Sequence, residues 1–193
     1  MVFYSIGEYL SNGISYLYTK MIWGKAARLI RLPFHARNRK NIYITAGFTT
    51  GYCCRVTAGK QESVNIGKHF VMGDFCQIEG QGGIKIGSNV LMGSRVFIGT
   101  TSHGNYSDDS SEQSSPNIPP NEREVCMEKI EIGDNVWIGN GVSVLKGVNI
   151  KKGSVIGANS VVVKDIPEYS IAVGAPAKVV KRYQFDTKLW ENI

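Results

Sequence analysis

An aliphatic residue recurs at every sixth position through most of the chain, and this period constrains the fold more than any other feature. Glycine often follows the aliphatic residue, and a small or apolar residue stands four positions after it. The clearest run is Ile132, Ile138, Val144, Ile150, Ile156 and Val162. A second run comprises Ile66, Met72 and Ile78 and, after a two-residue insertion, Ile86, Met92 and Ile98, with a fainter triplet of Ile44, Thr50 and Val56 before it.

A period of six fits neither an α-helix nor the two-residue alternation of a long strand. It fits a chain that forms a short strand, turns a corner and repeats, so that three hexapeptides complete one triangular coil. Such repeats bury their apolar faces only by stacking, so each aliphatic residue is expected to point inward. The fifteen repeats predict an all-β fold, a parallel β-helix of about five coils.

Three segments depart from the period. Residues 1–40 have helix-like apolar spacing and predict an N-terminal helical segment. Residues 99–131 interrupt the β-helix domain, residues 41–182, with a polar loop rich in Ser, Asn and Pro, and loops of this length are usually functional or disordered. Residues 183–193 form a tail in which we expect a short helix that covers the exposed end of the coils.

The formal net charge is +6, and the basic residues are concentrated near the N-terminus. Residues 20–40 contain seven Lys or Arg and no acid. A solvated surface explains such a run, as does peripheral contact with anionic lipid or a lipid-linked substrate. We expect no nucleic-acid partner, because aromatic interleaving and known binding motifs are absent from the sequence.

The four cysteines have neither CxxC pairing nor a His-bearing zinc spacing, so no metal site is expected. Cys54 and Cys76 fall on the small inward position of the repeat and are expected in the core. The N-terminus does not resemble a signal peptide, and no apolar run reaches the length of a membrane span. We therefore expect a cytoplasmic protein with free thiols, with residues 20–40 as its candidate contact with the inner membrane face.

His103 lies where the regular coils give way to the long loop. A lone histidine is more often structural than catalytic, but functional residues tend to sit on loops held by a rigid scaffold. His103 is therefore a candidate catalytic residue, whereas His35 and His69 are expected to be solvated.

The aliphatic–Gly series, the looped-out His103 and the stretches 132–139 and 155–178 together resemble the hexapeptide-repeat acetyltransferases. The similarity is greatest to galactoside and maltose acetyltransferases and to the O-acetyltransferases of O-antigen and capsular polysaccharide, and it spans about residues 60–182. This resemblance implies a left-handed β-helix and a homotrimer with its sites in clefts between neighbouring coils. It also implies acetyl-CoA as co-substrate and His103 as the general base.

The resemblance further assigns cofactor-binding positions, which are Trp137, Asn140, Ala158, Val163, Lys164, Lys178 and Lys181. Asn140 and Ala158 match backbone contacts near the pantetheine arm, and the two lysines at 178 and 181 match basic positions near the CoA phosphates. Val163 replaces a threonine and removes a hydroxyl contact. Trp137 matches an aromatic near the active cleft, and a wedge between trimer partners is an equal alternative.

On the acceptor side, Gly73 and Gln81 stand where the sugar acetyltransferases hold an acceptor-contacting Asn and Asp. They are the candidate substrate-binding positions, and because they differ from the family pattern they give no ground to assume a galactoside-type acceptor. The resemblance predicts an acetyl-CoA-dependent O-acetyltransferase of a sugar hydroxyl in bacterial surface polysaccharide. The alternative is an acyltransferase of an amino sugar or a serine-type acceptor; a γ-carbonic-anhydrase-like site would need three zinc-binding histidines, and only His103 is near the right region.

Overall fold

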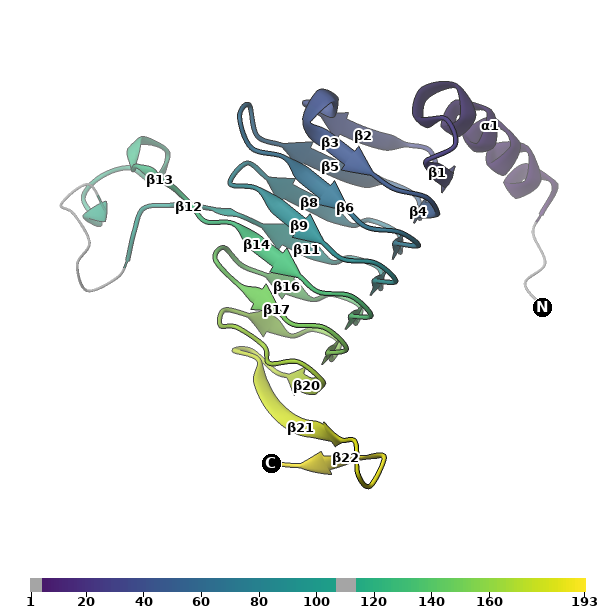
Figure 1. Cartoon of the computed structure of the whole chain (residues 1–193). Coiled ribbons are helices and arrows are strands. Elements are labelled where there is room, and N and C mark those ends of the chain that lie inside the picture. Colours follow the sequence, from purple (N-terminus) through teal and green to yellow (C-terminus); the bar gives the residue numbers. More distant parts are fainter. Residues whose placement is uncertain (1–4, 107–113) are drawn as a thin grey trace.

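The computed structural model describes residues 5–106 and 114–193, and it shows a stack of triangular coils with one helix at its N-terminal end (Figure 1). The first of three parallel sheets contains β1 (Ala27–Ile30), β4 (Phe48–Thr50), β7 (Val71–Met72), β10 (Leu91–Met92), β15 (Trp137–Ile138), β18 (Val155–Ile156) and β20 (Ser170–Val173). The second contains β2 (Phe34–Arg37), β5 (Cys54–Ala58), β8 (Gln77–Gly80), β11 (Phe97–Gly99), β16 (Ser143–Val144) and β19 (Val161–Val162). The third contains β3 (Ile42–Ile44), β6 (Val64–Ile66), β9 (Ile84–Ile86), β14 (Ile130–Ile132) and β17 (Asn149–Ile150).

The core is a set of ladders that run along the inside of the stack. Ile78 pairs with Ile98, and Ile98 pairs in turn with Val144 in the next coil. All twelve residues of the two clear repeat runs are at most 3% exposed. Most of the residues four positions later, including Cys76 and Ser154, are buried as well, and the exceptions are Gly82 and Ser102, where the regular coil is interrupted. The predicted β-helix and its inward stacking are therefore confirmed.

The corner between the first and second sheets repeats one backbone conformation in successive coils. Its left-handed residues have φ of 56–69° and are Cys53, Phe75, Arg95, Gly141 and Asn159. Each corner is tied to the one before it, for example by the hydrogen bond from Asn159 N to Asn140 O at 2.8 Å. The coils approach so closely that a Cβ on Gly93 would lie 2.7 Å from the backbone nitrogen of Asn140, which explains glycine there.

The expectation of about five coils was too low, because the first sheet holds seven parallel strands. The helical segment predicted for residues 1–40 is also shorter than expected: α1 (Ile6–Trp23) stops at Gly24, and β1, β2 and the 3-10 turn Arg39–Asn41 build an additional coil. The six-residue count missed this coil because its spacing is irregular. Ala27 pairs with Phe48, a bulge follows, and Thr49 pairs with Val71, 22 positions later.

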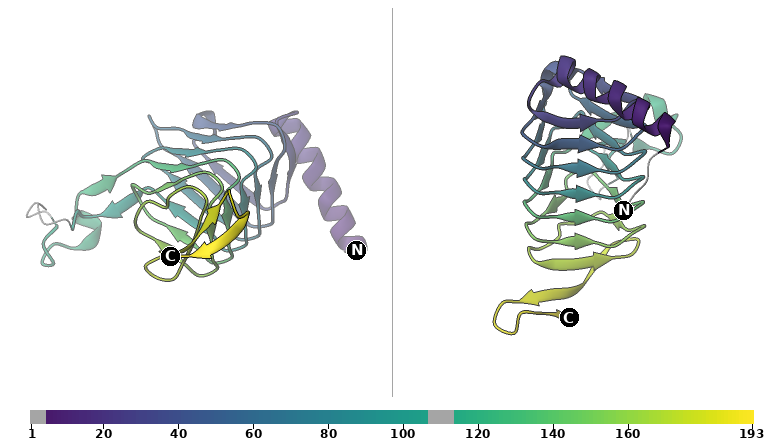
Figure 2. Two further views of the ribbon diagram at one scale, coloured as in Figure 1. Left: turned by 60° about the horizontal axis from the view of Figure 1, so that its bottom comes forward. Right: turned by 90° about the vertical axis from the view of Figure 1, so that its right-hand side faces the viewer.

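The short C-terminal helix expected in residues 183–193 is wrong. The chain instead forms an antiparallel hairpin of β21 (Lys178–Gln184) and β22 (Leu189–Asn192), which continues the first sheet beyond β20 (Figures 1 and 2). Cross-strand aromatic packing favours strands here, since the Tyr183 and Trp190 rings lie 5.3 Å apart.

The interrupting loop leaves the stack as an arm that projects from its side (Figures 1 and 2). Its base is an antiparallel pair of β12 (Thr101–His103) and β13 (Val125–Met127), and a 3-10 turn spans Pro120–Glu122. We call the described parts, residues 101–106 and 114–127, the arm. Residues 107–113 of the predicted loop lie outside the described residues.

Candidate functional site

His103 lies at the end of β12, where it pairs with Val125, and its side chain is exposed. Its main chain is held firmly. The Tyr106 hydroxyl donates a hydrogen bond to the His103 carbonyl at 2.6 Å and accepts one from Arg123 Nη1 at 2.7 Å. Gly104 N donates to Glu124 O at 2.7 Å. The arm therefore presents an open imidazole on a fixed backbone, as a proton acceptor for an external substrate requires.

The arm begins beside the outward-facing ladder of the second sheet. In this ladder Thr57 pairs with Arg37 in the preceding coil and with Glu79 in the following coil. Glu79 pairs in turn with Gly99, two residues before the arm. In the two following coils, Leu145 and Val163 occupy the equivalent edge and are 37% and 42% exposed. The arm thus separates a polar stretch toward the N-terminal end from an apolar stretch toward the C-terminal end.

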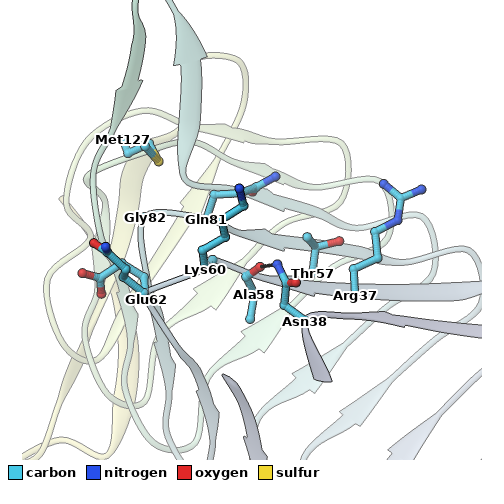
Figure 3. Close-up of a pocket in the computed structure, with 11 residues that line it drawn as sticks. Arg37, Asn38, Thr57, Ala58, Lys60, Glu62, Gln81, Gly82 and Met127 are labelled. Carbon is cyan, nitrogen blue, oxygen red and sulfur yellow. Dashed lines mark hydrogen bonds between the residues drawn. The ribbon is translucent and has the colours of Figure 1, made fainter. Parts of the chain in front are cut away.

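A cavity of about 940 Å³ lies on the polar side of the arm (Figure 3). Met127, the pairing partner of Thr101 at the base of the arm, forms part of its wall. The other lining residues include Arg37, Asn38, Thr57, Ala58, Lys60, Glu62, Gln81 and Gly82. The volume falls within the 300–1,000 Å³ that is usual for small-molecule sites.

Gln81 is the sequence-predicted acceptor residue that lines this cavity. Gly73 is placed elsewhere, at the corner between the first and second sheets, where its carbonyl accepts a hydrogen bond from the Cys54 thiol at 3.1 Å. A Cβ on Gly73 would lie 2.7 Å from the carbonyl carbon of Gly93 in the next coil. The structure therefore does not bring Gly73 and Gln81 together within this chain.

Sequence reasoning missed most of the cavity wall, including Thr57, Lys60 and Glu62. Its one signal was the two-residue insertion between Ile78 and Ile86. That insertion lengthens the corner at residues 80–83, and an equally irregular corner at residues 58–63 lies one coil away. Longer corners project from the stack, and the space between two projecting corners forms the cavity. Extra residues between repeats therefore indicate where a cavity can form.

The predicted cofactor residues lie around the last three coils. Asn140 and Ala158 are exposed and occupy the same corner in successive coils, because a Cβ on Gly139 would lie 2.7 Å from Ala158 N. The Asn140 side chain is already engaged, since its Oδ1 accepts a hydrogen bond from Ser94 N at 2.8 Å. A ligand can contact the backbone of this corner without breaking that bond.

The basic and apolar members of the set lie next to these corners. Lys178 pairs with Val173 and Lys181 with Ile171, so both lysines lie on β21 below the last coil. Ala177 N donates to Val161 O at 2.8 Å, which brings the start of β21 to the second sheet, where Val163 and Lys164 follow β19. Trp137 lies apart from them on the outward face of the first sheet and is 53% exposed.

The thiols of the core are poorly suited to nucleophilic chemistry. Cys54 and Cys76 are both fully buried. A hydrogen bond with Cys76 and burial together raise the pKa of the Cys54 thiol, whereas the same hydrogen bond lowers the pKa of the Cys76 thiol, which burial keeps out of reach of a substrate. Within residues 5–106 and 114–193 no group of three or more His, Cys, Asp or Glu is arranged to hold a metal ion, and no helix is long and apolar enough to cross a membrane.

Comparisons with known proteins identify the repeat. The family model for the bacterial transferase hexapeptide (six repeats) matches residues 129–164. A proposed lipopolysaccharide biosynthesis O-acetyl transferase, WbbJ of Escherichia coli K12, is 38% identical over 171 residues, which are 89% of this chain and 87% of that protein. The chain is therefore an all-β, left-handed β-helix with one N-terminal helix, as the hexapeptide resemblance predicted.

Two solved structures share this fold. A point variant of the N-acyltransferase AntD from Bacillus cereus, in complex with dTDP-4-amino-4,6-dideoxyglucose and coenzyme A, superposes with a TM-score of 0.67 at 22% identity over 96% of this chain and 92% of that one. The hexapeptide-repeat-containing acetyltransferase VCA0836 from Vibrio cholerae gives 0.52 at 26% identity over 91% and 82%. The AntD likeness extends to the fold alone.

Proposed function

The chain belongs to the bacterial hexapeptide-repeat acetyltransferases, and on that premise we propose that it transfers acetyl from acetyl-CoA to a sugar hydroxyl of surface polysaccharide. The observation that carries the proposal is the position of His103: an exposed imidazole on a braced arm, with a polar cavity on one side and an apolar edge on the other. The similarity to WbbJ, which extends over most of both chains, supports the polysaccharide acceptor.

In the proposed reaction, the imidazole of His103 takes the proton of the sugar hydroxyl as its oxygen attacks the thioester carbonyl carbon. A tetrahedral oxyanion forms, and backbone N–H groups of the cleft are the donors that would stabilise it. The carbon–sulfur bond then breaks, and the proton held by His103 passes to the departing CoA sulfur. Direct transfer needs no acyl-enzyme, which agrees with the burial of Cys54 and Cys76.

For acetyl-CoA, we propose the side of the arm that carries Leu145 and Val163. Their exposed side chains suit the pantetheine chain, and the backbone at Asn140 and Ala158 suits its amides. Lys178 and Lys181 would lie near the phosphates, where lysine neutralises charge without the bidentate geometry of arginine.

A thiol-release assay tests this function. Purified protein is incubated with acetyl-CoA and a panel of glycans, and free CoA and the acetylated product are measured together. An ester product, cleaved by mild alkaline hydroxylamine, supports O-transfer. An amide product, which survives that treatment, would instead establish the alternative acceptor, an amino sugar or another amine.

We further propose a homotrimer that assembles through the outward face of the first sheet. Val71, Leu91 and Trp137 are in register on three neighbouring strands and are 37%, 47% and 53% exposed. An apolar ladder of this kind suggests a protein contact. Light scattering coupled to size-exclusion chromatography should give three times the chain mass of 21.2 kDa, and Trp137→Asp should reduce it. A monomeric wild type contradicts the trimer.

Helix α1 presents its apolar side outward, which supports peripheral contact with anionic membranes at the cytoplasmic face. Its buried residues are Ser15, Thr19 and Trp23, and the two hydroxyls accept hydrogen bonds from Leu32 N and Ile30 N. The exposed stripe is at least 63% exposed at every position and comprises Ile6, Leu10, Ile14, Leu17 and Met21. The basic residues 20–40 follow directly, a pairing typical of helices that lie in a lipid interface.

Vesicle flotation tests this contact. The protein should float with phosphatidylglycerol vesicles at low salt, less with phosphatidylcholine, and not after Leu10→Asn and Leu17→Asn. Lys85→Gln, on the third sheet, is the control. No flotation of the wild type contradicts membrane contact, and a change in mass of the double variant would assign the stripe to a second copy.

A further inference from the structure

The cavity beside the arm contains buried hydrogen-bonding atoms that lack partners. Thr57 is 6% exposed, and neither its Oγ1 nor Oε1 of Gln81 has a hydrogen-bond partner among the described residues. An unsatisfied buried polar atom costs about 1–3 kcal/mol. Both side chains line the cavity, so hydroxyl groups of a bound ligand can supply the missing partners.

The cavity is also charged unevenly. Arg37 and Lys60 are exposed, and neither forms an ion pair with any residue in the described part of the chain. Figure 3 shows Arg37 on the side opposite Glu62 and Met127, with Lys60 between them. Glu79 stands between Thr57 and Gly99 in the ladder. The carboxylates therefore lie toward the arm, and the unpaired cation Arg37 lies at the far end.

The ladder sets the distance between these ends. Neighbouring strands of a sheet are about 4.8 Å apart. Arg37 is three strands from Gly99, so the cationic end lies about 14 Å from the point where the arm begins. One sugar ring spans only a fraction of that distance. A single molecule that reaches both ends must therefore be longer than a monosaccharide.

We propose that this cavity binds an extended acceptor, a glycan whose negative charge is carried at least one sugar unit or one linker away from the acetylated hydroxyl. The inference rests on the proposed function and adds the class of acceptor. Hydroxyls of the sugar nearest the arm bond to Gln81, hydroxyls of the next unit bond to Thr57, and Arg37 and Lys60 take the anionic group. A phosphate linker and a uronic acid residue both have this chemistry.

Binding to the His103→Ala variant, which separates affinity from turnover, tests the proposal by calorimetry. Trigalacturonate and UDP-glucose are the extended anionic probes, and maltotriose and glucose 1-phosphate are the neutral and the short controls. At least one extended anion should bind about tenfold more tightly than maltotriose and glucose 1-phosphate, the change in Kd that 1.4 kcal/mol produces. Which of the two does so distinguishes a uronate from a phosphate linker.

Substitutions in the cavity test which residues cause the preference for extended anionic probes. Arg37→Gln with Lys60→Gln should abolish the preference for the charged probe and leave the affinity for maltotriose unchanged. Lys85→Gln, which removes an exposed cation from the third sheet, should change neither. Gln81→Leu keeps the approximate size of the side chain but removes its hydrogen-bonding atoms, so it should weaken the binding of every probe. Circular dichroism confirms that each variant is folded.

Equal affinity for charged and neutral probes, no binding of any probe, or an unchanged preference in the Arg37/Lys60 double variant overturns the proposal. Failure of the proposed function is separate. If the proposed function fails, the cavity would bind the extended anions selectively but the wild type would transfer no acetyl group. If the wild type transfers acetyl to short neutral sugars and binds them as tightly as the extended anions, only the proposal of an extended anionic acceptor is overturned.

Discussion

The carbonyl oxygen of His103 accepts a hydrogen bond of 2.6 Å from the hydroxyl of Tyr106, three residues later. Arg123 crosses from the returning half of the arm to donate to the same hydroxyl, and its Nε donates to Ile118 O at 2.9 Å. The backbone that carries the candidate base is thus fixed by contacts that do not involve its imidazole. Tyr106 and Arg123 are positioning residues in the proposed mechanism.

Tyr106→Phe removes this bridge and keeps the ring. A lost hydrogen bond of about 1 kcal/mol corresponds to roughly a fivefold loss in rate. We expect kcat to fall by that factor while the KM for acetyl-CoA stays constant, because His103 becomes less well oriented and the cofactor side is untouched. Tyr43→Phe, on the third sheet, is the control in steady-state kinetics. An unchanged kcat would show that the bridge has no part in orientation.

Lys178 is expected to act on acetyl-CoA affinity and not on chemistry. Lys178→Ala should raise the KM for acetyl-CoA about fivefold with little change in kcat, since an exposed cation near a phosphate contributes about 1 kcal/mol. Lys178→Arg should retain affinity, and added salt should reduce the difference between wild type and the alanine variant. A fall in kcat at constant KM would place Lys178 at the reacting atoms instead.

Gly93→Ala tests the close approach of successive coils. The added Cβ would lie 2.7 Å from the backbone nitrogen of Asn140 and 3.0 Å from its Cα, which is too close for either backbone atom to accommodate it without a shift. The free energy of unfolding should fall by about 1–3 kcal/mol, as measured by urea denaturation. Gly13→Ala in α1 is the matched control, because no atom lies within 4 Å of its added Cβ, and it should stabilise by about 0.5–1 kcal/mol. Equal effects of the two substitutions contradict the packing argument.

The thiols predict a selective pattern of alkylation. A raised pKa keeps the buried Cys54 thiol protonated as pH rises, so iodoacetamide at pH 8 should modify the exposed Cys53 and spare Cys54. Mass spectrometry of the peptides measures this directly. Because no thiol takes part in transfer, Cys53→Ser should retain full activity. Loss of turnover in that variant would point to an acyl-cysteine intermediate.

The β-helix could be predicted because its inward-facing aliphatic residues recur at a regular spacing in the sequence. Ile98 must face inward to stack on Ile78 and Val144, so its six-residue spacing fixes both the strands and the corners. The first coil escaped prediction because the bulge after Ala27 and the 22-residue coil from Thr49 to Val71 break the count. The C-terminal hairpin escaped because nothing in the repeat extends to it, and its aromatic cross-strand pairs become visible only once the two strands are aligned.

The candidate site was predictable only in part. His103 stands out in sequence because it marks the change from repeat to loop, and Gln81 because of the family position. Thr57 and Lys60 carry no such signal, since a cavity wall depends on how corners of different coils project beside one another. Arg123 lies 20 positions after His103, and its role in bracing the arm follows from folding of the arm back on itself.

The most direct test of the central proposal is the rate of CoA release with a glycan acceptor, for the wild type and for His103→Ala. We expect the wild type to form an acetyl ester in step with CoA release. The variant should keep its fold, its mass in solution and its CoA affinity while losing about 10²–10⁴-fold in kcat, the usual contribution of a general base. A His103→Ala protein that acetylates at the wild-type rate would contradict the assignment.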